Sequence, residues 1–235
     1  MTNVIIIYII VSLLMGATNY LLTKNIILSL IVTLFFIFVF FFLVERKYKK
    51  YKLIKRKTKE CINFINNFVI TLSVNGSIST TLASISSGFS DELKDQISVI
   101  THLTDEDKIF YLDNYFENSM YKVFINLLKQ YLYEGGDILD STRILIFDSQ
   151  MLNNDIDNFS SVSKNKIFQF SYMWLICFGI LIATKFFMGE YYEKIQDMNY
   201  FPYAILVFFM VFGLCLYLIL NHSFNLDFVK KDVKK

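Results

Sequence analysis

The densest group of residues that could do chemistry is a set of acids in the middle of the chain. Asp105, Glu106, Asp107 and Asp113 supply carboxylates, which are common metal ligands. The first three directly follow Thr104, and a Thr followed by acids is typical of a helix N-terminus. There the hydroxyl caps free N–H groups and the acids favour the helix dipole. We therefore predict a solvated helix start here and no metal site.

The sequence lacks the common patterns of catalytic residues. The two histidines, His102 and His222, have no neighbouring residues at metal-ligand spacing. The chain has neither a Gly-rich phosphate loop ending in Lys-Ser/Thr nor a Gly-x-Ser-x-Gly turn. Its three cysteines, Cys61, Cys177 and Cys215, also have no metal-ligand spacing. We predict that the protein is not an enzyme and has no catalytic residue, no cofactor and no metal.

A strongly basic segment, which we call the collar, lies at residues 45–59. It has nine basic residues and one acid, a net charge of +8, whereas residues 60–168 have seven basic residues and fifteen acids, a net charge of −8. Basic residues beside a membrane span stay on the cytoplasmic side, and they attract anionic lipid headgroups. The collar therefore predicts the topology, either alone or together with binding of membrane lipids. Its basic residues are Arg46, Lys47, Lys49, Lys50, Lys52, Lys55, Arg56, Lys57 and Lys59.

Four apolar runs are long enough to cross a bilayer, which takes roughly 20 helical residues. They are Val4–Leu22, Ile26–Val44, Phe170–Gly189 and Tyr203–Leu220. The only charge inside them is Lys185, near the end of the third run. Transporters and channels keep charged groups inside their spans, so this class is disfavoured. No basic residue precedes the first run, which indicates an uncleaved helical hairpin rather than a secretion signal.

Charge on either side of these runs predicts the orientation of the chain. Residues 190–201 hold three acids and one lysine, which suits the outer face, and the C-terminal tail is rich in lysine. We predict a multi-pass protein of the cell membrane with both termini in the cytoplasm. The predicted segments are two transmembrane helices in 1–44, the collar in 45–59, a cytosolic helical domain in 60–168, two transmembrane helices with a short outer loop in 169–220, and a basic cytosolic tail in 221–235.

Apolar periodicity and capping residues predict an all-α cytosolic domain. The expected helices cover about 58–74, a short stretch capped by Ser77 and ending at Gly88, a stretch capped by Ser90, 104–117, 119–133, and a last helix capped by Asp137. No Gly or Pro occurs from Ile138 through Phe168. We therefore predict one nearly continuous helix that runs on into the third apolar run.

Two glycine-containing turns interrupt these helices. They are Asn75-Gly76-Ser77 and Glu134-Gly135-Gly136-Asp137. Glycine and asparagine accept the left-handed conformation in which many helices end, so turn chemistry alone accounts for both. The functional interpretation is that Asn75, Gly76, Ser77, Glu134, Gly135, Gly136 and Asp137 contact a partner.

The stretches around the two turns carry a resemblance to a known family. Phe68–Leu82 and Leu128–Asp140 resemble two motifs of the F domain in type II secretion and type IV pilus platform proteins. Two spans, one cytosolic helical domain and two more spans is similar to the layout of the TadB/TadC branch, the platform of tight-adherence pili. This chain differs from the family in having Thr80 and Thr81 where Ala or Leu is usual and in lacking the prolines beside the turns. The second F domain of the two-domain secretion and competence platforms is not expected here.

The resemblance implies a membrane scaffold that couples a cytoplasmic assembly ATPase to the insertion of pilins. The implied partners are that secretion or pilus ATPase, pilin-like subunits, and a second platform protein or another copy of this chain; no nucleic acid is expected. Gly16, Ala17, Gly179 and Gly213 would allow close helix contacts between copies. The alternative is a membrane-anchored signalling or regulatory protein, which would need a sensor site in the short outer loop.

Overall fold

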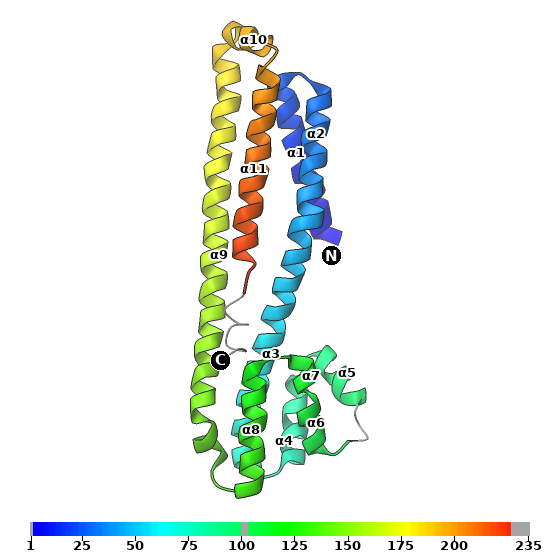
Figure 1. Ribbon diagram of the computed structural model, residues 1–235, viewed down its shortest axis with the longest axis vertical. Helices are drawn as coiled ribbons and strands as arrows, with labels where there is room; N and C mark the ends of the chain where they lie inside the picture. Colours follow the sequence, from blue (N-terminus) through cyan, green and yellow to red (C-terminus); the bar gives the residue numbers. More distant parts are fainter. Residues whose placement is uncertain (1, 100–102, 227–235) are drawn as a thin grey trace. The chain divides into compact units, whose positions relative to one another are not determined.

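The computed structural model describes residues 2–99 and 103–226, and all regular elements among them are helical (Figure 1). This confirms the prediction of an all-helical protein. The chain divides into two compact units. We call Met1–Tyr51 with Ser160–Asn225 the apolar unit, and Lys52–Phe159 with Leu226–Lys235 the polar unit. Helices α3 (Glu45–Asn75) and α9 (Ile138–Met188) contribute residues to both.

The apolar unit consists of long helices joined by short links. Its elements, besides parts of α3 and α9, are α1 (Thr2–Thr23), α2 (Ile26–Phe38), the π-helical segment η1 (Val39–Val44), α10 (Glu190–Gln196) and α11 (Phe201–Ser223). Asn25 caps α2 by accepting hydrogen bonds from the N–H groups of Ile27 and Leu28, at 3.1 and 3.3 Å. Gly189, with φ +44°, separates α9 from α10. These local signals account for the compact hairpins of the unit.

Within the described ranges, three helices are long and apolar enough to cross a membrane: Ile26–Asn75, Ile138–Met188 and Phe201–Ser223. Helix α1 has a shorter apolar stretch, Tyr8–Thr23. Large apolar side chains point away from the unit, including Phe187, which is 90% exposed. Such exposure is expected where the surroundings are lipid. The helices therefore indicate a membrane protein, and the four-span topology stays a prediction.

An aromatic core holds the helices of the apolar unit together. Phe36 and Phe209 are completely buried, and the ring of Trp174 lies 4.5 Å from that of Phe212, measured between centroids. Two of the glycines suggested for self-association, Gly16 and Gly213, allow close contacts between helices of this unit. A Cβ on Gly16 would clash with Thr33, and one on Gly213 would clash with Phe35, whereas Gly179 faces open space. The close contacts at Gly16 and Gly213 therefore lie inside the chain, so those two positions are not open for contacts with another copy.

Side chains of α9 and α10 satisfy carbonyl groups at the end of α1. The Tyr192 hydroxyl and the Gln196 amide both donate to the carbonyl of Leu22, at 3.0 and 3.1 Å, and the Lys185 ammonium donates to that of Leu21. The last carbonyls of a helix have no partner within the helix itself. These bonds tie the link between α9 and α11 to the first helical hairpin.

The polar unit is a bundle of shorter helices. They are α4 (Ile78–Ile85), the 3₁₀ segment η2 (Ser86–Gly88), α5 (Asp91–Val99), α6 (Asp105–Tyr111), α7 (Asp113–Phe116) and α8 (Ser119–Glu134), besides parts of α3 and α9. Three predicted caps are confirmed by hydrogen bonds to backbone N–H groups: Ser90 at 3.2 Å, Thr104 at 3.2 Å and Asp137 at 2.8 Å. Ser77 begins α4 without a side-chain hydrogen bond.

Two predicted helix boundaries are wrong, and the predicted continuous helix α9 is confirmed. The predicted helix start near residue 58 is wrong: α3 begins at Glu45 and directly continues η1 and α2, so that one helix runs over Ile26–Asn75. The Lys-rich and Arg-rich collar is itself a good helix former, and no breaker precedes it. The predicted helix over 104–117 is two helices, and Glu117 ends the second in a left-handed conformation with φ +47°. Helix α9 is continuous over 51 residues, as predicted. His102 and the tail lysines lie outside the described residues.

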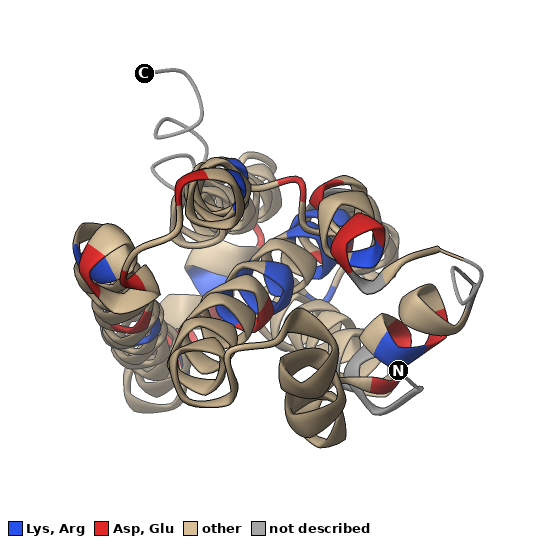
Figure 2. Cartoon of the chain, turned by 90° about the horizontal axis from the view of Figure 1, so that it is seen from below, with Lys and Arg blue, Asp and Glu red and all other residues tan. Residues whose placement is uncertain are grey.

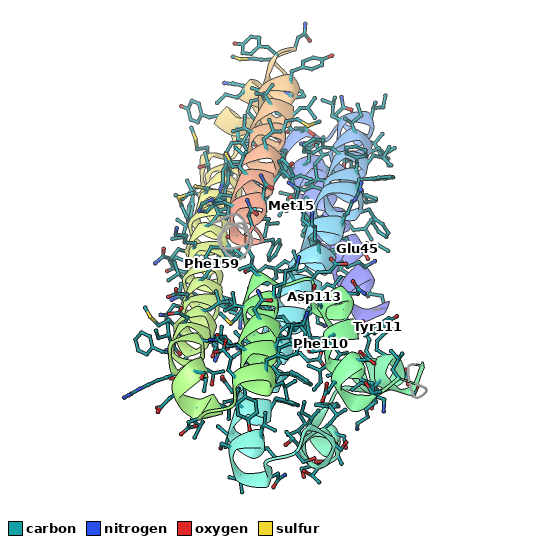
Figure 3. The ribbon with its side chains drawn as sticks, turned by 60° about the horizontal axis from the view of Figure 1, so that its bottom comes forward. Met15, Glu45, Phe110, Tyr111, Asp113 and Phe159 are labelled. Atoms are coloured by element: carbon teal, nitrogen blue, oxygen red, sulfur yellow. The ribbon has the colours of Figure 1, made fainter. Side chains whose placement is uncertain are left out.

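Aromatic side chains from α3, α7 and α8 form the core of the polar unit. Phe68, Tyr121 and Phe124 are completely buried, and Phe68 packs edge-on against Phe124 at 5.6 Å between centroids. The Tyr121 hydroxyl donates to the carbonyl of Ile109 at 2.9 Å. Figure 3 marks Phe110, Tyr111 and Asp113 on the neighbouring α6 and α7. The core therefore fixes the segments that carry the two predicted turns.

Candidate functional site

Four cations of the collar, Lys55, Arg56, Lys57 and Lys59, are bound to other groups of the polar unit, and we call them the bound half. Lys59 donates to both oxygens of Asp157, at 2.6 and 2.7 Å, and Lys55 lies 3.6 Å from the same carboxylate. Arg56 pairs with Glu92. Hydrogen bonding from Lys59, with the charges of Lys59 and Lys55, holds the pKa of Asp157 below its usual range. This half of the collar therefore joins α3 to α5 and α9.

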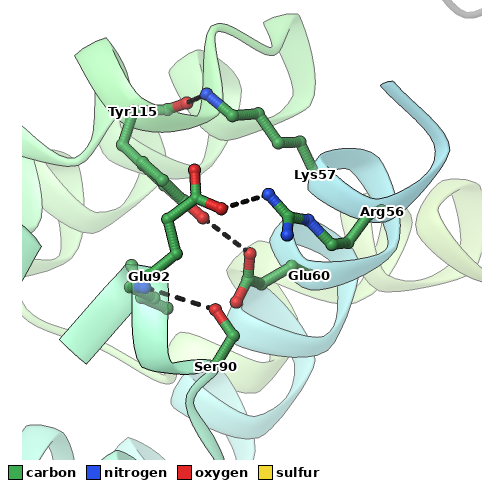
Figure 4. Close-up of polar contacts among 7 residues, drawn as sticks. Arg56, Lys57, Glu60, Ser90, Glu92 and Tyr115 are labelled. Atoms are coloured by element: carbon green, nitrogen blue, oxygen red, sulfur yellow. Dashed lines mark hydrogen bonds and ion pairs between the residues drawn. The ribbon is translucent and has the colours of Figure 1, made fainter. Parts of the chain in front are cut away.

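Tyr115 connects α7 to the same part of α3 (Figure 4). Its hydroxyl donates to Glu60 at 2.9 Å, and its carbonyl accepts from the ammonium of Lys57 at 2.9 Å. That ammonium also lies 4.6 Å from the centre of the Tyr115 ring, a cation–π contact. Burial, followed by the hydrogen bond to Glu60, raises the pKa of Tyr115 to about 12. The second carboxylate oxygen of Glu60 is buried without a partner among the described residues.

The other half of the collar is more exposed. In the apolar unit, Lys47 bonds to Asn221 and to the hydroxyl of Tyr217 at 3.2 Å, and Lys49 pairs with Glu45 at 2.7 Å one turn earlier. Three other basic residues are exposed and have no hydrogen bond or ion pair with any residue that the structure describes: Arg46, Lys50 and Lys52. Figure 2 shows basic and acidic positions together on several helices. The nine basic residues therefore form two groups with different surroundings.

The first predicted turn, Asn75-Gly76-Ser77, is exposed throughout. Gly76 has φ +66°, and its N–H closes the end of α3 by donating to the carbonyl of Leu72 at 2.8 Å. A Cβ at Gly76 would meet no atom within 4 Å, so only the backbone conformation requires glycine there. The geometry explains the sequence of this turn without a partner.

The second predicted turn, Glu134-Gly135-Gly136-Asp137, is also exposed. Gly135 and Gly136 have φ values of +72° and +107°, and neither Cβ position is crowded. Asp137 accepts from the N–H of Leu139, which starts α9. Both turns lie at the end of the polar unit where α3 and α8 finish (Figure 1). The structure thus brings the two motifs to the same end of one unit.

The predicted helix start at Thr104 is built by a reciprocal capping contact. The Thr104 hydroxyl donates to the Asp107 carboxylate at 2.7 Å and accepts from the Asp107 N–H at 3.2 Å. Among the described residues, no three His, Cys, Asp or Glu side chains lie close enough to hold a metal ion. Cys61 is completely buried, and burial raises the pKa of its thiol. The Thr104–Asp107 contact and the buried Cys61 side chain therefore contribute to folding.

Sequence reasoning missed the acids that bind the collar. Glu92 and Asp157 lie 36 and 98 residues from the cations that they bind. No periodicity or spacing links positions so far apart, and only the fold of the bundle brings them together. The excess of acids in residues 60–168 was a signal that such pairs exist, but it did not identify them.

The fold and these surfaces define an all-helical protein with apolar helices long enough to cross a membrane and a separate polar helical unit. In comparisons with known proteins, no family model, no curated protein and no solved structure matches the chain.

Proposed function

We propose that the protein is a platform of a type IV pilus-like (Tad/Flp) or type II secretion-like machine in the cytoplasmic membrane. In this proposal four spans hold the polar unit in the cytoplasm, with both termini on the same side. The polar unit receives a cytoplasmic assembly ATPase, and the spans pass pilin-like subunits into the fibre. The protein itself performs no catalysis.

The observation that carries the proposal is the order of segments along the chain: one helical unit is inserted between two sets of apolar helices. The polar unit occupies Lys52–Phe159, between the two chain segments of the apolar unit. This order is similar to the single-F-domain layout that the sequence resembles. The two exposed turns, whose sequences carry that resemblance, lie at one end of the polar unit and are accessible to a partner.

The exposed half of the collar supports the proposed orientation. Arg46, Lys50 and Lys52 are basic, exposed and directly follow the apolar stretch that ends at Val44. Cations at this position stay on the cytoplasmic side, and each one near an anionic surface contributes about 1 kcal/mol of lipid attraction. The bound half, by contrast, has part of its charge compensated by Glu92 and Asp157 and contributes less to lipid binding.

The test is affinity purification of the tagged full chain from mild-detergent membranes of its native host, followed by mass spectrometry. Recovery of a secretion-type ATPase or a pilin supports the proposal. Glu134→Arg, at the second turn, is expected to reduce that recovery, whereas Asp95→Arg, an equally exposed change on α5, is expected to leave it unchanged. Recovery of a kinase or regulator instead would refute the platform proposal and favour the signalling alternative.

The signalling alternative has less structural support because polar side chains of the predicted outer loop, residues 190–201, are already hydrogen-bonded within the protein. Tyr192 and Gln196 of α10 are buried and bound to the carbonyl of Leu22. A sensor in this link would have to bind its signal with the few remaining polar side chains of a seven-residue helix.

A further inference from the structure

A groove between α8 and α9 of the polar unit takes no part in the contacts described above. Its volume is about 610 Å³, and the two helices that form it lie side by side (Figure 1). Met120, Val123 and Leu127 line it from α8, and Ile144 and Met151 line it from α9. The floor of the groove is therefore made of flexible and branched apolar side chains.

Several of the apolar side chains in and beside the groove are exposed. Ile144 is 76% exposed, Met151 51% and Val123 47%, and Phe147 on the adjoining turn of α9 is 61% exposed. Contiguous apolar surface of this kind outside a membrane marks an interaction site. The longest apolar stretch of α9 that could meet lipid begins later, near Phe170.

The charged residues that line the groove, among those described, are two acids. Asp148 and Asp155 have no hydrogen bond or ion pair with any described residue, in contrast to Asp157 nearby. They are seven residues apart on α9, so they lie on one face, about 10.5 Å apart along the axis. The groove thus combines an apolar floor with two carboxylates spaced by two helical turns.

We propose that this groove binds a cationic amphipathic helix of a partner protein. A helix lying along the groove would place apolar residues on the floor and Lys or Arg, seven residues apart, against Asp148 and Asp155. A membrane surface is a poorer occupant, because anionic lipids would repel the two carboxylates. The proposal holds whichever machine or pathway the protein serves, and so does not rest on the platform function.

A second copy of the chain is also a poorer occupant. The helical segment with the most cations in this chain is the collar, and four of its cations, Lys55, Arg56, Lys57 and Lys59, are bound within their own polar unit. The collar cations that a second copy could offer without releasing a contact, Arg46, Lys50 and Lys52, include no two that are seven residues apart. The partner is therefore expected to be a different chain.

The test uses the full chain in nanodiscs of zwitterionic lipid, with empty nanodiscs as competitor. A display library of amphipathic helical peptides is selected for binding, and the dissociation constants of recovered peptides are measured at low salt. We expect the peptides to have Lys or Arg seven residues apart. Replacing Asp148→Asn and Asp155→Asn together should weaken binding about five- to tenfold, as expected for two partly exposed ion pairs.

Two further variants separate groove binding from general effects. Ile144→Glu should weaken binding at least about tenfold, because it places a charge in the apolar floor. Val74→Glu, at an 80% exposed apolar position on α3, should leave binding unchanged. Recovered peptides without the paired cations, or equal binding by the Asp148 and Asp155 variant, would overturn the proposal. A lower particle mass of Ile144→Glu relative to the unmodified chain would assign the groove to a second copy instead and would also overturn it.

Discussion

Replacing Gly135 by alanine tests whether the second turn is a structural requirement of the backbone. Gly135 has φ +72° and ψ −161°, a region that is essentially restricted to glycine. No atom lies within 4 Å of the position that a Cβ would take, so a clash contributes nothing to the expected cost. The backbone strain alone should amount to about 1–3 kcal/mol. That corresponds to an equilibrium constant for local opening that rises roughly five- to 150-fold.

Hydrogen exchange followed by mass spectrometry on the full chain in detergent measures this effect directly. Peptides covering the end of α8 and the start of α9 should exchange faster in Gly135→Ala by that factor. Gly88→Ala is the matched control, because its Cβ position is also open and its φ is not positive. Similar exchange in the two variants would refute the strain argument. If Gly135→Ala instead abolished recovery of the ATPase or pilin in the affinity purification without faster exchange, Gly135 would act through contact with that partner.

Four other predictions follow from the two units. Phe68→Ala should destabilise the polar unit by about 3–5 kcal/mol, seen as faster limited proteolysis, because it empties a completely buried site. Cys61 should react with a maleimide only after denaturation, tested with both other cysteines replaced by serine, because burial shields the thiol and raises its pKa. Asp157→Asn should cost less than about 1 kcal/mol of stability at neutral pH. Since folding lowers the pKa of Asp157, its contribution is present above the usual carboxyl pKa and disappears as the pH falls through the lowered value; thermal melts of both proteins should therefore converge in acid. Gly16→Ala should lower the melting temperature through its clash with Thr33, whereas Gly179→Ala, which meets open space, should leave it unchanged.

Local signals predicted three of the four expected caps, whereas Ser77 begins α4 without a side-chain hydrogen bond. Ser90, Thr104 and Asp137 each cap the helix that they were expected to cap, because a cap depends on atoms within three residues. The start of α3 was predicted too late because the prediction followed the apolar periodicity, which begins at Cys61, although Lys and Arg also favour helices. The left-handed Glu117 that ends α7 has no glycine to indicate it.

Contacts between distant segments were beyond sequence reasoning. The two groups within the collar depend on which of its cations face α5, α7 and α9, and that depends on how the bundle packs around Phe64 and Phe68. The same holds for Gly16 and Gly213, which sequence alone suggested as contacts between copies. Their roles are decided by Thr33 and Phe35, which face them within the same unit. The composition of each segment was informative, but the choice of partner for each residue was not encoded locally.

The helical period explains why some acids of α9 are bound and others are free. Asp155 and Asp157 are two residues apart, so they point about 200° apart around the helix. Asp157 faces α3, where Lys55 and Lys59 neutralise it, whereas Asp155 and Asp148 face the groove beside α8. One helix thus uses one face to close the bundle and leaves the other negatively charged beside exposed apolar side chains. Among the described residues, no cation pairs with Asp148 or Asp155, and this second face is the one that the proposed partner helix would neutralise.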